Sequence, residues 1–436
     1  MQHLAVRGLS RDAPGPLAAA VCALLALGCS APPGPLRRFL SDAEQRRALL
    51  LESLRSRDND YARARIARYA GGGRPDWTTL PRFLPPSAPL PADGTALADE
   101  QLRPLDTSLP PPERDTADER ELQQALVRLG QSAFFRYPAQ LVSGFDRLAG
   151  SPELARSYGL WSAMGPDGQA QLGGLVRVRL PSGDRALALS CSTCHAAPAE
   201  DGTLSAGAAN TELDLGRLAS DTAGGADLPP ARWGPGRLDT SHDGVDNPAA
   251  IPELRVVGAQ RYLHHDATVR NGLFALALRI ETLITTSLSE GAAPPVEVAL
   301  GLASYLTLNT PAPAPVRADD PGLAVFQAHC ARCHQGDELA GEPVPLAEIG
   351  TDDTLGTSRE RGTSAYRTPT LRRVGLRRQL LHDGSLPDLG ALLEPRRLDE
   401  GYTGGRHGPG RVAGHRYGLD LVASERAALL AFLQTR

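Results

Sequence analysis

The stretches that decide the fold are Cys191-Ser-Thr-Cys194-His195 and Cys330-Ala-Arg-Cys333-His334, two copies of the pattern Cys-x-x-Cys-His. The chain has 436 residues and six cysteines, so the two motifs hold four of the six. Cys-x-x-Cys-His is the attachment signal of c-type haem. Two thiols one helical turn apart reach the two vinyl groups of the porphyrin, and the adjacent histidine then ligates the iron.

Other uses of paired cysteines fit the sequence less well. A thioredoxin-type motif follows a strand in a βαβ unit, a pattern that is missing here. A zinc ribbon places its two pairs about 15–20 residues apart, whereas 135 residues separate Cys194 from Cys330. A disulfide in each pair would leave both histidines unexplained. We therefore expect two covalently attached c-type haems, bound by Cys191, Cys194, Cys330 and Cys333, with His195 and His334 as iron ligands.

An internal repeat follows the motifs. Residues 252–266 and 369–383 match at 9 of 15 positions without gaps. Two motifs, each followed by one copy, predict two homologous domains that arose by duplication. We expect a first haem domain at residues 114–310 and a second at 316–436, joined through the proline-rich stretch that ends at Pro315.

These features resemble a known superfamily. The two motifs, with Thr368-Pro-Thr-Leu-Arg-Arg-Val-Gly375 and Leu381-His-Asp-Gly384, look like those of bacterial di-haem cytochrome c peroxidases, MauG-type enzymes and rubber oxygenases. The resemblance covers about residues 115–436. It implies a mainly α fold of two cytochrome c-like haem domains with loop-rich segments. In such proteins one haem is often the reactive iron and the other passes electrons.

Periodicity predicts the main elements. Alternating apolar residues over 174–190 indicate a small β-hairpin before the first haem motif. Capping boxes at Ser41 with Glu44 and at Thr116 with Glu119 predict two helix starts. Further helices are expected at 272–288, at 296–308, from Pro321 and at 424–433.

The second axial ligand of each iron decides whether the haem only carries electrons or also binds oxygen or peroxide. The chain has 2 Met, Met1 and Met164, so at least one haem lacks a methionine ligand. The peroxidases place Met, and MauG-type enzymes Tyr, in a stretch that here reads Leu392 to Arg397 and has neither. Gly414-His415-Arg-Tyr417-Gly418 resembles the rubber-oxygenase C-terminus, in which such a histidine caps the second haem.

Several roles stay open at this stage. For the first haem, Met164, His242, His264 or no second ligand remain possible. The resemblance suggests that His265 and His382 hold a haem propionate or fix a loop. Arg255 and Arg372 are candidate propionate partners, because arginine matches carboxylates bidentately. Trp233 is either an electron relay or a core residue. We recognise no distal acid–base set, so catalytic residues stay unassigned.

The N-terminus predicts export. Residues 1–28 have basic residues followed by an apolar run of eleven, which is typical of a secretory signal and too short for a membrane span. Cys29 follows Gly28, as in a bacterial lipoprotein, so we expect a lipid anchor at Cys29 as the sole membrane contact, in the periplasm or on the outer membrane. Residues 29–113 form an N-terminal helical and Pro-rich segment. The net charge of −4 argues against nucleic-acid binding.

The function that we expect is electron transfer by an exported di-haem c-type cytochrome. Its partner would be a redox protein or a small electron donor or acceptor. The alternative is a peroxidase or oxygenase of the MauG-type group that uses one open haem iron. If both irons have six ligands, the first function is favoured. If one iron has an open coordination position, the second is favoured.

Overall fold

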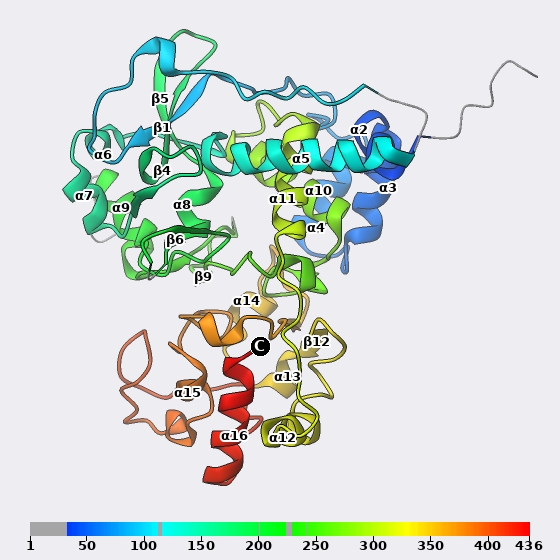
Figure 1. Cartoon of the computed structure of the whole chain (residues 1–436), viewed down its shortest axis with the longest axis vertical. Helices are drawn as coiled ribbons and strands as arrows, with labels where there is room; N and C mark the ends of the chain where they lie inside the picture. The colour runs from blue at the N-terminus through cyan, green and yellow to red at the C-terminus, as the bar shows by residue number, and fades with distance from the viewer. Residues whose placement is uncertain (1–32, 112–115, 200, 224–228, 242) are drawn as a thin grey trace, which may run out of the picture.

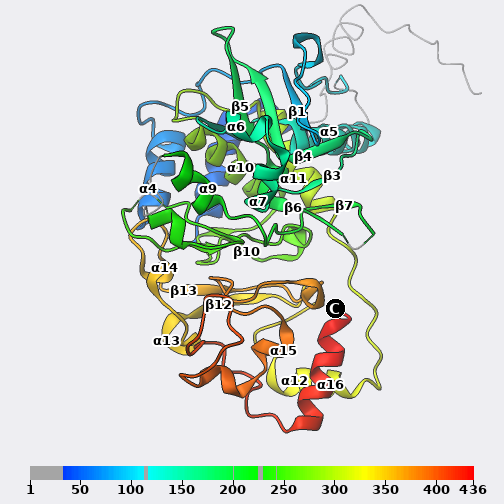
Figure 2. The ribbon, with the colours of Figure 1, turned by 90° about the vertical axis from the view of Figure 1, so that its left-hand side faces the viewer.

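The computed structural model describes residues 33–111, 116–199, 201–223, 229–241 and 243–436. The expected signal peptide (1–28) and lipid anchor at Cys29 lie outside these residues. The described chain forms two lobes, one up to about residue 310 and one from α12 (Pro321–His329) to the C-terminus (Figures 1 and 2). Each lobe has its own hydrophobic core. The predicted linker runs extended along the outside between them (Figure 2).

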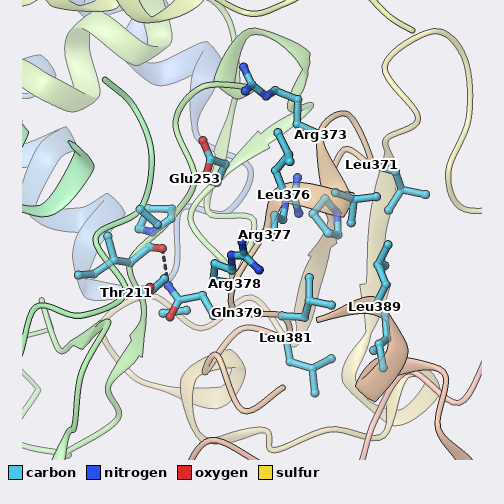
Figure 3. Close-up of a pocket in the computed structure, with 18 of the residues that line it drawn as sticks. Thr211, Glu253, Leu371, Arg373, Leu376, Arg377, Arg378, Gln379, Leu381 and Leu389 are labelled. Atoms are coloured by element: carbon cyan, nitrogen blue, oxygen red, sulfur yellow. Dashed lines mark hydrogen bonds between the residues drawn. The ribbon is translucent and has the colours of Figure 1, made fainter. Parts of the chain in front are cut away.

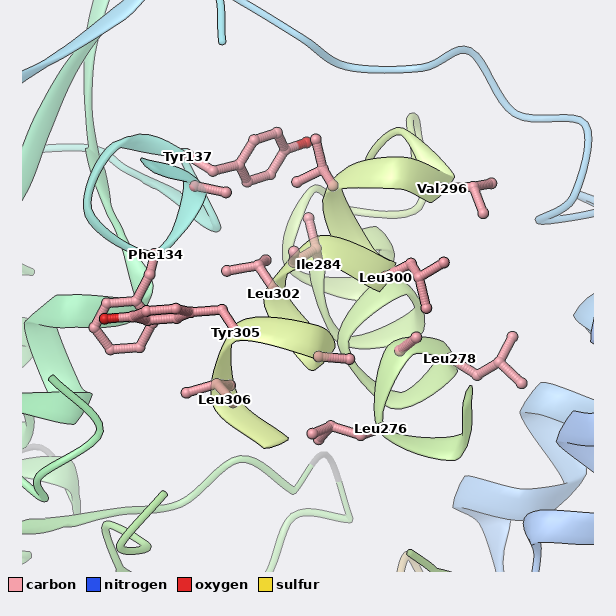
Figure 4. Close-up of a cluster of buried hydrophobic side chains, with 14 of the residues drawn as sticks. Phe134, Tyr137, Leu276, Leu278, Ile284, Val296, Leu300, Leu302, Tyr305 and Leu306 are labelled. Atoms are coloured by element: carbon pink, nitrogen blue, oxygen red, sulfur yellow. The ribbon is translucent and has the colours of Figure 1, made fainter. Parts of the chain in front are cut away.

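Three long helices build the core of the first lobe. They are α5 (Thr116–Arg136), α10 (Leu273–Ser287) and α11 (Val296–Leu308), close to the predicted ranges. The apolar sequence of α11 suits its position, because ten of its residues are buried and seven of these belong to this hydrophobic core (Figure 4). Two glycines let α5 and α11 cross closely, since a Cβ on Gly130 would lie 1.9 Å from the carbonyl oxygen of Gly301.

The N-terminal segment packs on these helices. It contains α2 (Pro35–Ser41), α3 (Ala43–Ser53), α4 (Asp60–Arg65) and one π-helical turn (Ile66–Ala70). The predicted capping box at Ser41 is wrong: the next residue, Asp42, accepts the backbone N–H groups of Glu44 and Gln45. Glu119 accepts N–H groups at the start of α2, so it ties α5 to the N-terminal segment.

An antiparallel five-stranded sheet lies beside the helices. Its strands are β1 (Ser87–Pro91), β2 (Gln140–Val142), β3 (Ser162–Met164), β4 (Ala170–Arg179) and β5 (Arg185–Leu189), in the order β1-β4-β5-β2 with β3 also on β4. The predicted hairpin is confirmed as β4–β5. It leads directly into α8 (Cys191–His195), so the sheet positions the first motif.

The expectation of a mainly α fold is wrong. The chain is 38% helical and 15% strand, with several small sheets, and is therefore mixed α/β. Four two-stranded sheets have strands too short for a period-two signal. They are β6 (Ala196–Pro198) with β7 (Leu204–Ala206), β8 (Arg237–Leu238) with β9 (Ala249–Ala250), β10 (Tyr262–Leu263) with β11 (Val269–Arg270), and β12 (Gly341–Pro345) with β13 (Ala365–Thr368).

The second lobe is built on one helix pair. There α12 crosses α16 (Ala423–Gln434), with Phe326 and Phe432 rings 5.3 Å apart. Gly322 allows the crossing, because a Cβ there would lie 2.3 Å from the carbonyl oxygen of Ala428. The shorter helices are α6 (Asp146–Ala149), α7 (Pro152–Ser157), α9 (Leu215–Thr222), α13 (Leu346–Ile349), α14 (Thr354–Thr357) and α15 (Leu389–Leu392). Five 3₁₀ turns are Asp99–Gln101, Pro229–Arg232, Val257–Ala259, Val374–Leu376 and Pro395–Leu398.

The sequence repeat has the same backbone in both lobes. The 3₁₀ turn at Val257–Ala259 corresponds to the one at Val374–Leu376. The pairing Leu263↔Val269 corresponds to the bridge Leu380↔Leu386. His264 and Leu381, also equivalent, both have positive φ, of 61° and 69°. Among the described helices none is long and apolar enough to span a bilayer.

Candidate cofactor-binding site between the two motifs

A cavity of about 1080 Å³ lies against the second motif and extends toward the first lobe. Cys330, Cys333 and His334 all line it. Most of the wall around them is aliphatic, and Figure 3 shows Leu371, Leu376, Leu381 and Leu389 of this wall, with Arg377 between them and Glu253. A volume of this order suits a large, mostly apolar cofactor. Further aliphatic side chains come from Val344, Ile349, Val374, Leu380, Leu392, Leu393, Leu429 and Leu433.

Both motif histidines are oriented through Nδ1. His195 Nδ1 lies 3.1 Å from the carbonyl oxygen of Pro252, and His334 Nδ1 lies 3.1 Å from that of Leu339. A carbonyl oxygen only accepts, so Nδ1 must carry the proton and Nε2 stays free. A metal-ligating histidine is held in this way by its other ring nitrogen. Pro252 opens the first copy of the repeat, and its counterpart Pro369 also interacts with His334.

None of the four motif cysteines forms a disulfide with another described residue. Burial raises the pKa of Cys191 and of Cys194 to about 12, and that of Cys330 to about 11. A redox-active Cys-x-x-Cys pair has a lowered thiol pKa instead. The buried thiols therefore argue against the thioredoxin-type interpretation, and they suit a covalent attachment within an apolar wall.

His415 lines the same cavity as His334. Burial first, and the neighbouring His334 next, lower the pKa of His415 to about 4, so its ring is neutral near pH 7. Its Nδ1 is buried and has no hydrogen-bond partner among the described residues. The backbone at His415 has φ of +43°, which a non-glycine residue adopts only when its surroundings hold it there.

Arg397 is what holds this loop. It is fully buried and donates to the carbonyl oxygens of Val412 (2.7 Å), Gly414 (2.8 Å) and His415 (2.8 Å). Hydrogen bonds from a charged donor are stronger than neutral ones. The stretch from Leu392 to Arg397, which has neither Met nor Tyr, thus supplies the residue that holds the backbone of His415 in place.

The first motif has a different setting. Cys191, Cys194 and His195 are not among the described residues that line the cavity. Three lining residues contact the motif directly. Trp161 Nε1 donates to the Ser192 carbonyl (3.0 Å), the backbone N–H of Asn210 donates to the Cys194 carbonyl (2.9 Å), and the Pro252 carbonyl accepts from His195. The cavity therefore reaches the support of the first motif rather than the motif itself.

The remaining candidates divide into two groups. His265 and His382 line the cavity, as does Arg255, which forms an ion pair with Glu253. Met164 is 53% exposed, and Arg372 donates to the carbonyl oxygens of Asp337 and Pro311.

Neither Met164 nor Arg372 is among the described lining residues, and the same holds for His264 and Trp233. His242 lies outside the described residues. Trp233 donates to Asp246, so nothing links it to the cavity. The pairing of Arg372 with a propionate stays a prediction, and its side chain here donates to backbone carbonyl groups instead.

Sequence reasoning missed several cavity residues. Arg367 and Arg377 are partly buried and line the cavity, and each has a buried Nε atom without a described hydrogen-bond partner. Tyr366 stacks on His382 with ring centroids 4.3 Å apart. Arg377 belongs to the second copy of the repeat, so the repeat was the available signal, but the many other arginines gave no reason to prefer it.

Comparisons with known proteins add no name. No protein-family model, curated protein or solved structure matches the chain. Within the described part of the chain, no group of three or more His, Cys, Asp or Glu side chains is arranged to hold a metal ion. A haem iron needs only one or two protein ligands, since the porphyrin supplies the others.

Proposed function

We propose that the chain is a di-haem c-type cytochrome that transfers electrons and acts outside the cytoplasm. The observation that carries the proposal is the cavity of the second motif, in which Cys330, Cys333 and His334 share one aliphatic wall with His415. A bound haem supplies one-electron transfer at its iron. The residues of the chain attach it, orient it and shield it from water.

The wall around the second motif fits this group. Thiols, an imidazole whose Nε2 is free, and a largely aliphatic surface are the chemistry that a c-type haem needs. His415 offers a second imidazole. Burial lowers its pKa to about 4, so the ring is neutral near pH 7, and its Nδ1 has no hydrogen-bond partner among the described residues. Two imidazole ligands make a six-coordinate iron that exchanges electrons without binding oxygen or peroxide, so electron transfer is favoured over oxygen chemistry at the second motif.

At the first motif the main support for the proposal is the orientation of its histidine. His195 has the same Nδ1 arrangement as His334, with the carbonyl of Pro252. Cys191 packs against the helical core and Cys194 against the core of the sheet. The surrounding side chains of the first motif would therefore keep water away from its haem and keep the two thiols in place.

An electron paramagnetic resonance spectrum of the purified ferric protein, with its absorption spectrum, tests the proposal. We expect two low-spin haems, each with c-type absorption. A high-spin ferric signal that changes on addition of hydrogen peroxide would replace this function by the peroxidase or oxygenase alternative. Absence of c-type absorption would contradict both functions.

A further inference from the structure

A group of buried cations lies where the N-terminal segment meets both lobes. The guanidinium carbons of Arg65, Arg279 and Arg361 lie 3.3, 5.8 and 5.7 Å from the centre of the Tyr61 ring. The His264 ring stands edge-on to Tyr61 at 5.0 Å. Arg65 comes from α4, Arg279 from α10 and Arg361 from the second lobe. We call this group, together with Arg367, the arginine cluster.

The arginine cluster has more positive than negative charge. Two carboxylates, Asp266 and Glu360, face the four guanidinium groups. Burial, followed by neighbouring charges, lowers the pKa of Arg65 and of Arg367 to about 10. Burial also raises the pKa of Asp266 to about 6, which weakens its value as a counterion. Buried charges are normally paired, and here four guanidinium groups face two described carboxylates.

Several buried polar atoms in the arginine cluster have no hydrogen-bond partner among the described residues. They are Nη1 of Arg279 and Nε of Arg367, together with Nδ1 of His264 and Oδ2 of Asp266. Nε of Arg361 also lacks a hydrogen bond, but it lies 3.6 Å from Oε1 of Glu360. A buried donor without an acceptor is destabilising, so the two unpaired guanidinium donors of Arg279 and Arg367 point to an acceptor that binds here.

The arginine cluster borders the cavity. Arg367 belongs to both, and His265, next to His264 in sequence, also lines the cavity. Guanidinium groups bind carboxylate and phosphate oxygens bidentately. We propose that the arginine cluster binds a doubly charged oxyanion that enters from the cavity. Two sources share this chemistry: the paired propionates of a haem in the cavity and a free dianion such as phosphate. The first source rests on the proposed function, whereas the second does not.

The test compares variants of the full-length holoprotein. Arg279→Gln removes a charge, Arg279→Lys keeps it, and Arg63→Gln is the control, because Arg63 is on α4 but its side chain is 64% exposed. Calorimetry with inorganic phosphate tests the free dianion: one site is expected, weakened roughly tenfold or more in Arg279→Gln and unchanged in Arg63→Gln. If calorimetry finds no phosphate site in the wild type, potentiometry tests the haem propionates. Arg279→Gln should then lower the reduction potential of one haem, Arg279→Lys should restore it, and Arg63→Gln should leave it unchanged.

The result that overturns the inference is a folded Arg279→Gln protein with neither effect. If that variant does not fold, Arg361→Gln makes the same comparison from the second lobe. The failure of the proposed function is seen separately. A wild-type protein whose mass shows no haem sinks the function, and the phosphate titration then decides alone whether the arginine cluster is an anion site.

Discussion

The two Cys-x-x-Cys-His motifs have the same pentapeptide pattern but different surroundings. The second motif opens on a cavity that also contains His415, with Arg397 behind it. The first lies between two hydrophobic cores, and the cavity reaches only the residues that support it. Under the proposed function the pentapeptide would supply the attachment and one iron ligand. The residues that face it across the cavity, such as His415, come from segments far away in sequence.

The largest expected effect is the loss of one haem. Replacing Cys330 and Cys333 by Ala removes both thioether partners at the cavity, so we expect the mass of the purified protein to fall by one haem. Arg332→Gln is the matched control, since Arg332 lies between the two cysteines with its side chain 62% exposed. Both haems should remain in that control. Two haems in the double variant would show that the second motif is not an attachment site.

The next effect tests the role of His415 at the second motif. His415→Ala removes the imidazole that shares the cavity with His334, so under the proposed function one haem should change from low spin to high spin in the electron paramagnetic resonance spectrum. His407→Ala is the control, because His407 bonds the Asp383 carbonyl and is not among the described cavity residues. An unchanged spectrum in His415→Ala would refute the role of His415.

A smaller effect is expected from Arg397, which holds the backbone loop of His415. Arg397→Gln leaves the carbonyl oxygens of Val412, Gly414 and His415 without their charged donor. We expect unfolding to become easier by about 2–4 kcal/mol and a partial high-spin signal. Urea denaturation and the spectrum of the same sample measure both. The neighbouring exposed Arg396, changed to Gln, should alter neither; equal effects of the two variants would argue against positioning by Arg397.

The helix crossings test whether the two lobes are built alike. A Cβ at Gly130 or at Gly322 would collide with backbone of the partner helix. Gly130→Ala and Gly322→Ala should each cost about 1–3 kcal/mol of unfolding free energy. Gly150→Ala, with nothing within 4 Å of the added Cβ, should cost much less. If only one of these two substitutions lowers the free energy of unfolding, the two helix crossings contribute differently to stability.

The last effect is a pH dependence at the boundary of the lobes. Burial, then Arg367, then His382 and Arg377 lower the pKa of His265 to about 3, while the Ala250 carbonyl raises it. The unfolded chain takes up a proton below about pH 6.5, and the folded protein does not. Stability is therefore present at neutral pH and falls as pH drops from 6.5 toward 3, by at most about 1.4 kcal/mol per pH unit.

Urea denaturation at pH 6.5, 5.5 and 4.5 measures this slope. His265→Gln should make the slope shallower by about one proton. The exposed His329, changed to Gln, is the control. The same slope in His265→Gln and in wild type would show that His265 does not contribute.

The sequence predicted the local features and missed the contacts between segments. The long helices, the hairpin and the motif histidines follow from period, turn residues and spacing. The short strands did not, because most of them have two or three residues and carry no detectable alternation, and β12 is interrupted by two prolines. His415 was selected from its flanking residues, whereas Arg397 and Arg367 were not, since only the folded chain brings them to the loop and the cavity. The expectation of a mainly α fold failed because the small sheets were not detected in the sequence.

The mass of the intact, purified protein tests the central claim most directly. We predict that denatured protein exceeds its processed polypeptide by the mass of two haems, and that peptides containing Cys191 with Cys194 and Cys330 with Cys333 each retain one. A mass equal to that of the polypeptide alone, with four free thiols, would contradict the account.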